Sequence, residues 1–162
     1  MPDVLLSSDS GASRVLTFNR PDALNAFNQD LWYALTDALD AAAVDDAVRC
    51  VLLTGTGRAF SAGQDLTEMA DPSIFEDSEP GYEHLMPTLE TFPKPLLAAV
   101  NGVGVGIGLT ILLHCDMVLI ASDARLKVPF MSLGVTTEAA ASLLLPAIFF
   151  REPAADDIYT EP

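Results

Sequence analysis

The sequence predicts an α/β fold with several strand–strand–helix units rather than a strict βαβ alternation. Short apolar runs bounded by turn residues, such as "RCVLLTG" at 49–55 and "KPLLAAV" at 94–100, are typical of buried strands. Between them, apolar residues recur at three- and four-residue spacing from Leu31 to Ala42, which is typical of an amphipathic helix. A chain of 162 residues that is 50% hydrophobic can bury one core, so we expect a single domain over residues 1–162.

The first elements are predicted to be a hairpin and a helix. We expect "SRVLTF" at 13–18 to pair with "VLL" at 4–6 across the turn-rich "SSDSG". The next stretch, "NRPDALNAFN", contains Pro21 and is predicted to be a loop. Asn28 is a suitable N-cap for the helix that follows, with Asp30 in its first turn.

The middle of the chain is less regular. The strand at 49–55 leads into "GTGRAFSAGQDL", which is small and glycine-rich and opens into a segment with helical potential around 64–70. Residues 71–92 are acidic and irregular in pattern, and we expect one helical piece near 82–91.

The C-terminal third begins with the strand at 94–100 and a run of alternating glycines. An apolar helix near 107–114 and a strand "DMVLIA" at 116–121 are predicted to follow. The last predicted element is a helix from Glu138 to Phe150, with Thr136 or Thr137 as its cap.

Composition excludes several classes of function. The formal net charge is −15, with 8 Lys and Arg against 23 Asp and Glu, so binding to nucleic acid or to an anionic membrane surface is not expected. The two cysteines, Cys50 and Cys115, lie in apolar runs without metal-ligand spacing, which favours buried thiols, no metal site and a reducing, cytoplasmic location. The N-terminus has no signal-peptide pattern.

The stretch "AVNGVGVGIGLTILLHCD" has four glycines at alternate positions, from Gly102 to Gly108. Its apolar part is too short for a membrane span and is bounded by Asn101 on one side and His114 on the other. The spacing also fails the dinucleotide and P-loop motifs. Two interpretations remain open: close packing of a helix start against a strand, or unpaired backbone N–H groups that hold a developing oxyanion.

A second glycine-containing turn, "FSAGQDL", also follows a strand and precedes a predicted helix, so the two turns could each direct one N–H at the same oxygen. At this point "FNRPDALNAFN", "GRAFSAGQDL" and "KPLLAAVNGVGVGIGLTILLHCDMVLIASDARL" resemble, in order and spacing, the enoyl-CoA hydratase/isomerase (crotonase) superfamily. The resemblance covers about residues 4–150. It implies a crotonase-like spiral of strand–strand–helix units that binds an acyl-CoA thioester and assembles as a homotrimer or hexamer. Relatives continue into C-terminal helices, so we expect a truncated or unusually short member that lacks most of that helical region.

The resemblance also implies site residues. The oxyanion-hole donors would be the backbone N–H groups of Gln64 and Ile107, while the Gln64 side chain has no role. No separate cofactor is implied, because coenzyme A is part of the substrate. The residues implied to line the coenzyme and acyl sites are Ala23, Leu24, Ala62, Asp65, Leu66 and Phe130.

The catalytic carboxylates vary within the superfamily, and this sequence is informative about them. The positions that match the two glutamates of the hydratases are Thr110 and Phe130, neither of which can act as an acid or base. "PFMSLGVTTEAAAS" is similar to the segment that carries the single glutamate of the Δ3,Δ2-enoyl-CoA isomerases, which implies a catalytic role for Glu138. The competing interpretation is that Glu138 only caps its helix. Burial would raise the pKa of its carboxyl and a helix N-terminus would lower it.

Other features leave alternatives open. Asp22 stands where relatives often have a basic residue near the coenzyme phosphates, so Arg20, Arg58 or a neighbouring subunit would have to supply positive charge. His114 is predicted to be a packed core residue, and Tyr82 to border the acyl pocket. The alternatives to an isomerase are a non-catalytic acyl-CoA-binding homologue and a protein with hydratase-type activity.

Overall fold

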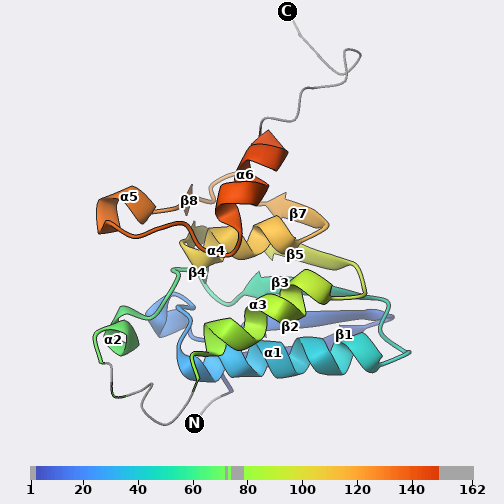
Figure 1. The fold of residues 1–162 in the computed structure, drawn as a ribbon. Helices are drawn as coiled ribbons and strands as arrows, with labels where there is room; N and C mark the ends of the chain where they lie inside the picture. Colours follow the sequence, from blue (N-terminus) through green and yellow to red (C-terminus); the bar gives the residue numbers. More distant parts are fainter. Residues whose placement is uncertain (1–2, 72, 74–78, 150–162) are drawn as a thin grey trace, which may run out of the picture.

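Two β-sheets with helices packed around them form the molecule (Figure 1), which a computed structural model describes for residues 3–71, 73 and 79–149. The larger sheet has the strand order β1-β2-β3-β5-β7, and all its pairs are parallel except the β1–β2 hairpin. Its strands are β1 (Leu5–Ser10), β2 (Ser13–Phe18), β3 (Cys50–Gly55), β5 (Leu96–Val100) and β7 (Met117–Ile120). The smaller sheet is parallel throughout and consists of β4 (Ala59–Ser61), β6 (Val103–Val105) and β8 (Leu126–Lys127).

After the β1–β2 hairpin and α1, the chain alternates between the two sheets from β3 onwards, and a helix follows each pair of strands. This order confirms the predicted α/β class and the strand–strand–helix units. The helices that close the units are α2 (Leu66–Met69) after β4, α4 (Ile107–Thr110) with its 3-10 extension η3 (Ile111–His114) after β6, and α5 (Phe130–Leu133) after β8. Because β4 and β6 are neighbours in the smaller sheet, the turns that follow them end up side by side.

The smaller sheet was not predicted, and its dimensions explain why. Its strands have two or three residues each. Such strands are too short to show the alternation of apolar and polar residues by which a strand is recognised in a sequence. Two of them also lie in the glycine-rich stretches that the sequence marks as turns. Only the pairing of distant segments makes these residues strands.

Helices α1 (Gln29–Val44) and α3 (Gly81–Thr91) lie together against one face of the larger sheet, and the 3-10 helix η1 (Pro21–Ala23) precedes α1 (Figure 1). The predicted cap is confirmed, since Asn28 Oδ1 accepts a hydrogen bond from Leu31 N at 3.1 Å. Gly81 allows α3 to approach α1 closely, because a Cβ there would lie 2.4 Å from Trp32 Cβ.

An aromatic cluster joins α1 to both sheets. The ring centroids of Phe18 and Phe60 are 5.2 Å apart, and those of Phe27 and Trp32 are 4.5 Å apart. All four side chains are at most 2% exposed. Burial of each such side chain stabilises the fold by about 1.5–3 kcal/mol, so the cluster is a major part of the core that α1 shares with the two sheets.

Two predicted boundaries are wrong and a third is right. The first hairpin turns at Gly11, which has φ +61°, because β1 continues through the polar "SSDS" that was expected to be the turn. The predicted extent of the apolar helix, 107–114, is confirmed, since it is α-helical to Thr110 and continues as the 3-10 helix η3 to His114. The C-terminal helix α6 spans Ala141–Phe149; it does not begin at Glu138, so neither Thr136 nor Thr137 caps it. The predicted end, Phe150, lies outside the described residues.

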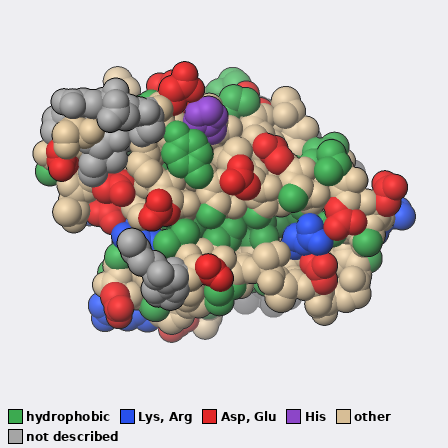
Figure 2. All heavy atoms as spheres, turned by 90° about the horizontal axis from the view of Figure 1, so that it is seen from below, with side chains coloured by type: hydrophobic (Ala, Val, Ile, Leu, Met, Phe, Trp, Pro, Cys, Tyr) green, Lys and Arg blue, Asp and Glu red, His purple; other side chains and the backbone are tan. Residues whose placement is uncertain are grey.

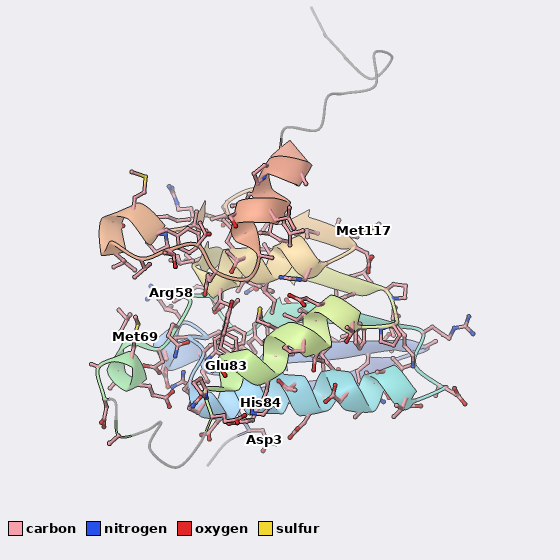
Figure 3. The ribbon with its side chains drawn as sticks, in the orientation of Figure 1. Asp3, Arg58, Met69, Glu83, His84 and Met117 are labelled. Carbon is pink, nitrogen blue, oxygen red and sulfur yellow. The ribbon has the colours of Figure 1, made fainter. Side chains whose placement is uncertain are left out.

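The surface agrees with the composition. Seen from below, acidic side chains are spread over one face around a strip of hydrophobic side chains (Figure 2), in keeping with the net charge of −15. At the edge of the larger sheet, Met117 and Leu119 on β7 are more than half exposed (Figure 3). Within the described ranges, no helix is long and apolar enough to cross a membrane, and no three His, Cys, Asp or Glu side chains cluster to hold a metal ion.

Both cysteines are half-buried free thiols. Burial raises the pKa of the Cys115 thiol to about 12, with a further contribution from Asp116. A thiol with such a pKa stays protonated and unreactive at neutral pH, so Cys115 serves packing.

Candidate active site

Two strand-to-helix turns meet at the ends of β4 and β6. Each contains a glycine with positive φ, +98° at Gly63 and +54° at Gly106, a conformation that side-chain-bearing residues rarely adopt. The turns are in contact, since a Cβ on Gly63 would lie 2.7 Å from Val105 O and 3.8 Å from Gly106 Cα.

The residue after each of these glycines has an unpaired backbone N–H. Among the described residues, neither Gln64 N nor Ile107 N donates a hydrogen bond. Gln64 and Phe27 form a parallel bridge, in which Phe27 N donates to Gly63 O and Asp65 N donates to Phe27 O. The Gln64 N–H takes no part in this bridge and points away from Phe27. Ile107 is the first residue of α4, where an N–H has no partner within the helix. Two free donors on touching turns are suited to hold one anionic oxygen.

Side chains hold the first turn in place. The Gln64 side chain points away from the turn, and its Oε1 accepts a hydrogen bond from Trp32 Nε1 at 3.1 Å. Asp65 caps α2 through Thr67 N and also accepts a hydrogen bond from Arg20 at 2.9 Å. Burial raises the pKa of the Asp65 carboxyl, but the bonds from Arg20 and Thr67 outweigh it, so the pKa lies below its ordinary value.

Close packing holds the second turn. At two of the four alternate glycines, Gly102 and Gly108, backbone atoms lie so close that no side chain would fit, and Gly106 has a positive φ that side-chain-bearing residues rarely adopt. Close packing, one of the two interpretations left open by the sequence, is therefore confirmed for this stretch, and the oxyanion role of the turn stays a prediction. A Cβ would lie 2.2 Å from Arg58 O at Gly102, 2.6 Å from Leu126 Cδ2 at Gly104 and 2.3 Å from Ser61 O at Gly108.

Glu138 brings a carboxyl group to the second turn from the loop between α5 and α6. Its Oε1 accepts a hydrogen bond from Thr110 Oγ1 at 3.1 Å and lies 3.9 Å from the place of a Cβ on Gly106. Burial raises the pKa of the Glu138 carboxyl, and the bond from Thr110 opposes this only in part. Because α6 begins at Ala141, the capping role that competed for Glu138 is wrong.

The loop that carries Glu138 is strained and held from two sides. Ala139 and Ala140 have φ of +47° and +54°, in the left-handed region. The Ala139 N–H donates to the Tyr82 hydroxyl at 2.8 Å, and the Ala139 carbonyl oxygen lies 3.1 Å from His114 Nε2. His114 is thus half-buried next to the candidate base, a neighbourhood that its apolar flanking sequence does not reveal.

The structure brings some of the predicted coenzyme-binding residues together. The first loop meets the first turn through a 2.9 Å hydrogen bond from Ala62 N to Leu24 O, and Ala23 lies next to it in η1. Leu66 is 69% exposed at the start of α2. Phe130 is half-buried at the start of α5, and its place in an acyl pocket stays a prediction.

Of the two arginines considered for the coenzyme phosphates, only one is exposed. Arg20 is committed to Asp65 and to the Ala26 carbonyl oxygen. Arg58 is exposed and lies above α2 in the view of Figure 3. Two surface hollows of about 240 Å³ lie elsewhere, one between β5 and β7 and one between α1 and α3.

Comparison with known proteins gives consistent matches. The family model described as enoyl-CoA hydratase/isomerase matches residues 10–156. The 1,2-epoxyphenylacetyl-CoA isomerase of Escherichia coli is 37% identical over 95% of this chain and 61% of its own length. The 2,3-dehydroadipyl-CoA hydratase of the same organism is 40% identical over 75% of this chain and 48% of its own length.

A solved structure agrees with these sequence matches. The enoyl-CoA hydratase/isomerase of Pseudoalteromonas atlantica superposes with a TM-score of 0.85 at 42% identity, over 89% of this chain and 57% of that one. The chain therefore spans about half to three fifths of the length of these relatives.

Proposed function

Because the chain belongs to the enoyl-CoA hydratase/isomerase family, we propose that it shifts the double bond of a 3-enoyl-CoA to the 2-position, with Glu138 as the single acid and base. The observation that carries this proposal is the meeting of three groups. The free N–H groups of Gln64 and Ile107 lie on touching turns, and the Glu138 carboxyl lies beside one of those turns.

The proposed reaction needs one base and two amides. The Glu138 carboxylate removes a proton from C2 of the thioester, and the electron pair of the broken C–H bond forms a C1=C2 double bond as the carbonyl oxygen becomes negative. The Gln64 and Ile107 N–H groups hold that oxygen. The carboxyl then returns the proton to C4: the electron pair of the C3=C4 double bond forms the new C4–H bond, the C1=C2 pair moves to C2=C3, and the oxygen electrons restore the carbonyl. A raised pKa suits both steps, because the group must accept a proton and release it near neutral pH.

The choice of isomerase over hydratase rests on the residues around the hole. Addition of water needs one group to activate the water and another to deliver a proton. Thr110 and Phe130 occupy the positions implied for the hydratase glutamates, and the Thr110 hydroxyl is bonded to Glu138. The relatives include both an isomerase and a hydratase by name, so they support the family chemistry rather than one branch of it.

Coenzyme A would lie along the first loop and the first turn, against Ala23, Leu24, Ala62, Asp65 and Leu66. The Asp65 carboxylate is already bonded to Arg20 and Thr67, so this residue would contribute through its backbone. Arg58, which is exposed, is the basic side chain proposed for the phosphates. A homotrimer or hexamer and a cytoplasmic location remain part of the proposal.

The test is isomerisation of 3-hexenoyl-CoA, followed by the ultraviolet absorbance of the conjugated product. We expect turnover by the full chain and a loss of about 10²–10⁴-fold in kcat for Glu138→Gln, the usual contribution of a general base. With deuterium at C2, a single carboxyl should carry part of the label to C4. An unchanged rate in Glu138→Gln would refute the proposal.

Two further measurements separate the alternatives. Hydration of crotonyl-CoA in isotopically labelled water would place the label in a 3-hydroxy product and identify hydratase-type activity. Thermal stabilisation by the thioester without any product would identify a non-catalytic acyl-CoA binder.

A further inference from the structure

The hydroxyl group of Thr110 lies between the candidate base and the candidate oxyanion turn. Its Oγ1 is 3.1 Å from Glu138 Oε1 and 3.3 Å from the Gly106 carbonyl oxygen. The residue is fully buried, with 0% of its surface exposed, so water does not compete for the hydroxyl. A threonine hydroxyl has one hydrogen to donate and can accept in return. It can therefore donate to the carboxylate or to the carbonyl, but not fully to both.

The Gly106 carbonyl belongs to the same peptide group as the Ile107 N–H. It already accepts hydrogen bonds from Leu109 N at 2.8 Å and Thr110 N at 2.9 Å. A further donor on the carbonyl oxygen polarises the peptide and makes its N–H a stronger donor, because hydrogen bonds in a chain reinforce one another. The Thr110 hydroxyl is thus connected to the proposed oxyanion donor through a single peptide group.

We propose that Thr110 is a positioning residue that couples the proton on Glu138 to the strength of the Ile107 oxyanion donor. Before proton transfer, the hydroxyl donates to the Glu138 carboxylate and stabilises its charge. After transfer, the protonated Glu138 donates its new O–H to Thr110 Oγ1, and the Thr110 hydrogen turns to the Gly106 carbonyl; both hydrogens turn back when the carboxyl delivers its proton to C4. The Ile107 N–H is then strengthened at the stage when the enolate oxygen carries its negative charge. This inference rests on the proposed function of Glu138.

The other titratable groups near Glu138 do not replace this hydroxyl. Tyr82 on α3 and His114 on η3 both bond to the backbone of Ala139 rather than to the carboxyl. Burial raises the pKa of the Tyr82 hydroxyl, and the nearby charge of Glu138 adds to the effect. Tyr82 therefore stays neutral over the pH range in which Glu138 titrates.

The first test is the pH dependence of kcat in wild type, Thr110→Val and Thr110→Ser. Valine keeps the shape without the hydroxyl, and serine keeps the hydroxyl. Loss of one hydrogen bond to a charged group should move the acid limb up by about one pH unit in Thr110→Val. In Thr110→Ser the acid limb should return to its wild-type position, and the KM of both variants should change by less than about twofold. An unmoved limb in Thr110→Val, or the same shift in both variants, would overturn the proposal. Thr110→Ala replaces the valine variant if that fails to fold.

The second test needs no turnover. Glu138→Gln imitates the protonated base, because its amide can donate to Thr110 Oγ1. In that background, Thr110→Val should weaken binding of acetoacetyl-CoA, which can bind as an enolate, by about 3–10-fold, and binding of butyryl-CoA by less than about twofold. Equal weakening of both ligands would assign Thr110 a purely structural role and overturn the inference. If the wild type bound neither thioester, the proposed function itself would fail.

Discussion

The two kinds of functional group in the candidate site are held by different means. The proposed amide donors lie on turns in which Gly63 and Gly106 adopt positive φ, and the pairing of β4 with β6 holds the two turns together. Glu138 lies on a loop held by single polar contacts: Tyr82 and His114 bond to the backbone of the left-handed Ala139, and Thr110 bonds to the Glu138 carboxyl. The turns are therefore sensitive to any added side chain. The base loop, by contrast, should respond to removal of single polar groups at a distance.

Gly106→Ala, in the second turn, is expected to have the largest effect on activity. A Cβ at this φ should turn the peptide and displace the Ile107 N–H, so kcat should fall about 10²–10³-fold, as for other lost oxyanion donors. Gly11→Ala is the matched control, since Gly11 has φ +61°, nothing lies within 4 Å of its Cβ position, and the site is distant. It should lose about 1–2 kcal/mol of stability and keep full activity. Equal activity in the two variants would show that the second turn supplies no donor.

Asp65→Asn probes how the first turn is held. The Arg20–Asp65 pair has side chains only 20% and 14% exposed, so its loss should reduce the free energy of unfolding by about 1–3 kcal/mol, measured by urea titration. Because the Asp65 pKa is lowered in the fold, this contribution is present above about pH 4, the value of an unfolded aspartate, and is lost as pH falls through the folded value.

Asp9→Asn is the control for this pair, since the Asp9 side chain is 53% exposed beside Arg14. We expect a much smaller change in stability, because solvent screens an exposed ion pair. A larger loss in Asp9→Asn than in Asp65→Asn would contradict the role given to the buried pair.

Tyr82→Phe tests the distant support of the base loop. It leaves the Ala139 N–H without its partner, so we expect kcat to fall up to about tenfold and the free energy of unfolding to fall by about 0.5–1.5 kcal/mol. Tyr33→Phe removes a hydroxyl that donates to the Glu79 carbonyl on the exposed side of α1, and it should leave kcat unchanged. The support is unnecessary if both variants match the wild type.

The smallest expected effect is on stability in Glu138→Gln. A carboxyl whose pKa is raised in the fold contributes stability that is complete below the unfolded pKa and is lost as pH rises through the folded pKa. The glutamine variant has no such loss, so its melting temperature should exceed that of the wild type slightly at pH 8 and match it below about pH 4. A lower melting temperature at pH 8 would mean that the ionised carboxyl stabilises the loop.

Local patterns in the sequence predicted the features that depend on neighbouring residues. The amphipathic spacing and Asn28 cap gave α1, and the glycine turns pointed to two amide donors. The position of Glu138 was harder to predict, because "EAAAS" is a good helix former and contains no glycine to mark a left-handed turn. The partners of Ala139 come from α3 and η3, and no local pattern connects segments so distant along the chain.

The left-handed pair Ala139–Ala140 has a consequence for motion. If these alanines relaxed to right-handed values, α6 could extend backwards and take Glu138 into its first turn, away from Gly106. Each left-handed alanine costs about 1–2 kcal/mol. Tertiary contacts therefore hold the loop against the tendency of these alanines to adopt right-handed helical angles. The Ala139 amide, protected only by the Tyr82 hydroxyl, should report this opening by hydrogen exchange at a lower free energy than global unfolding.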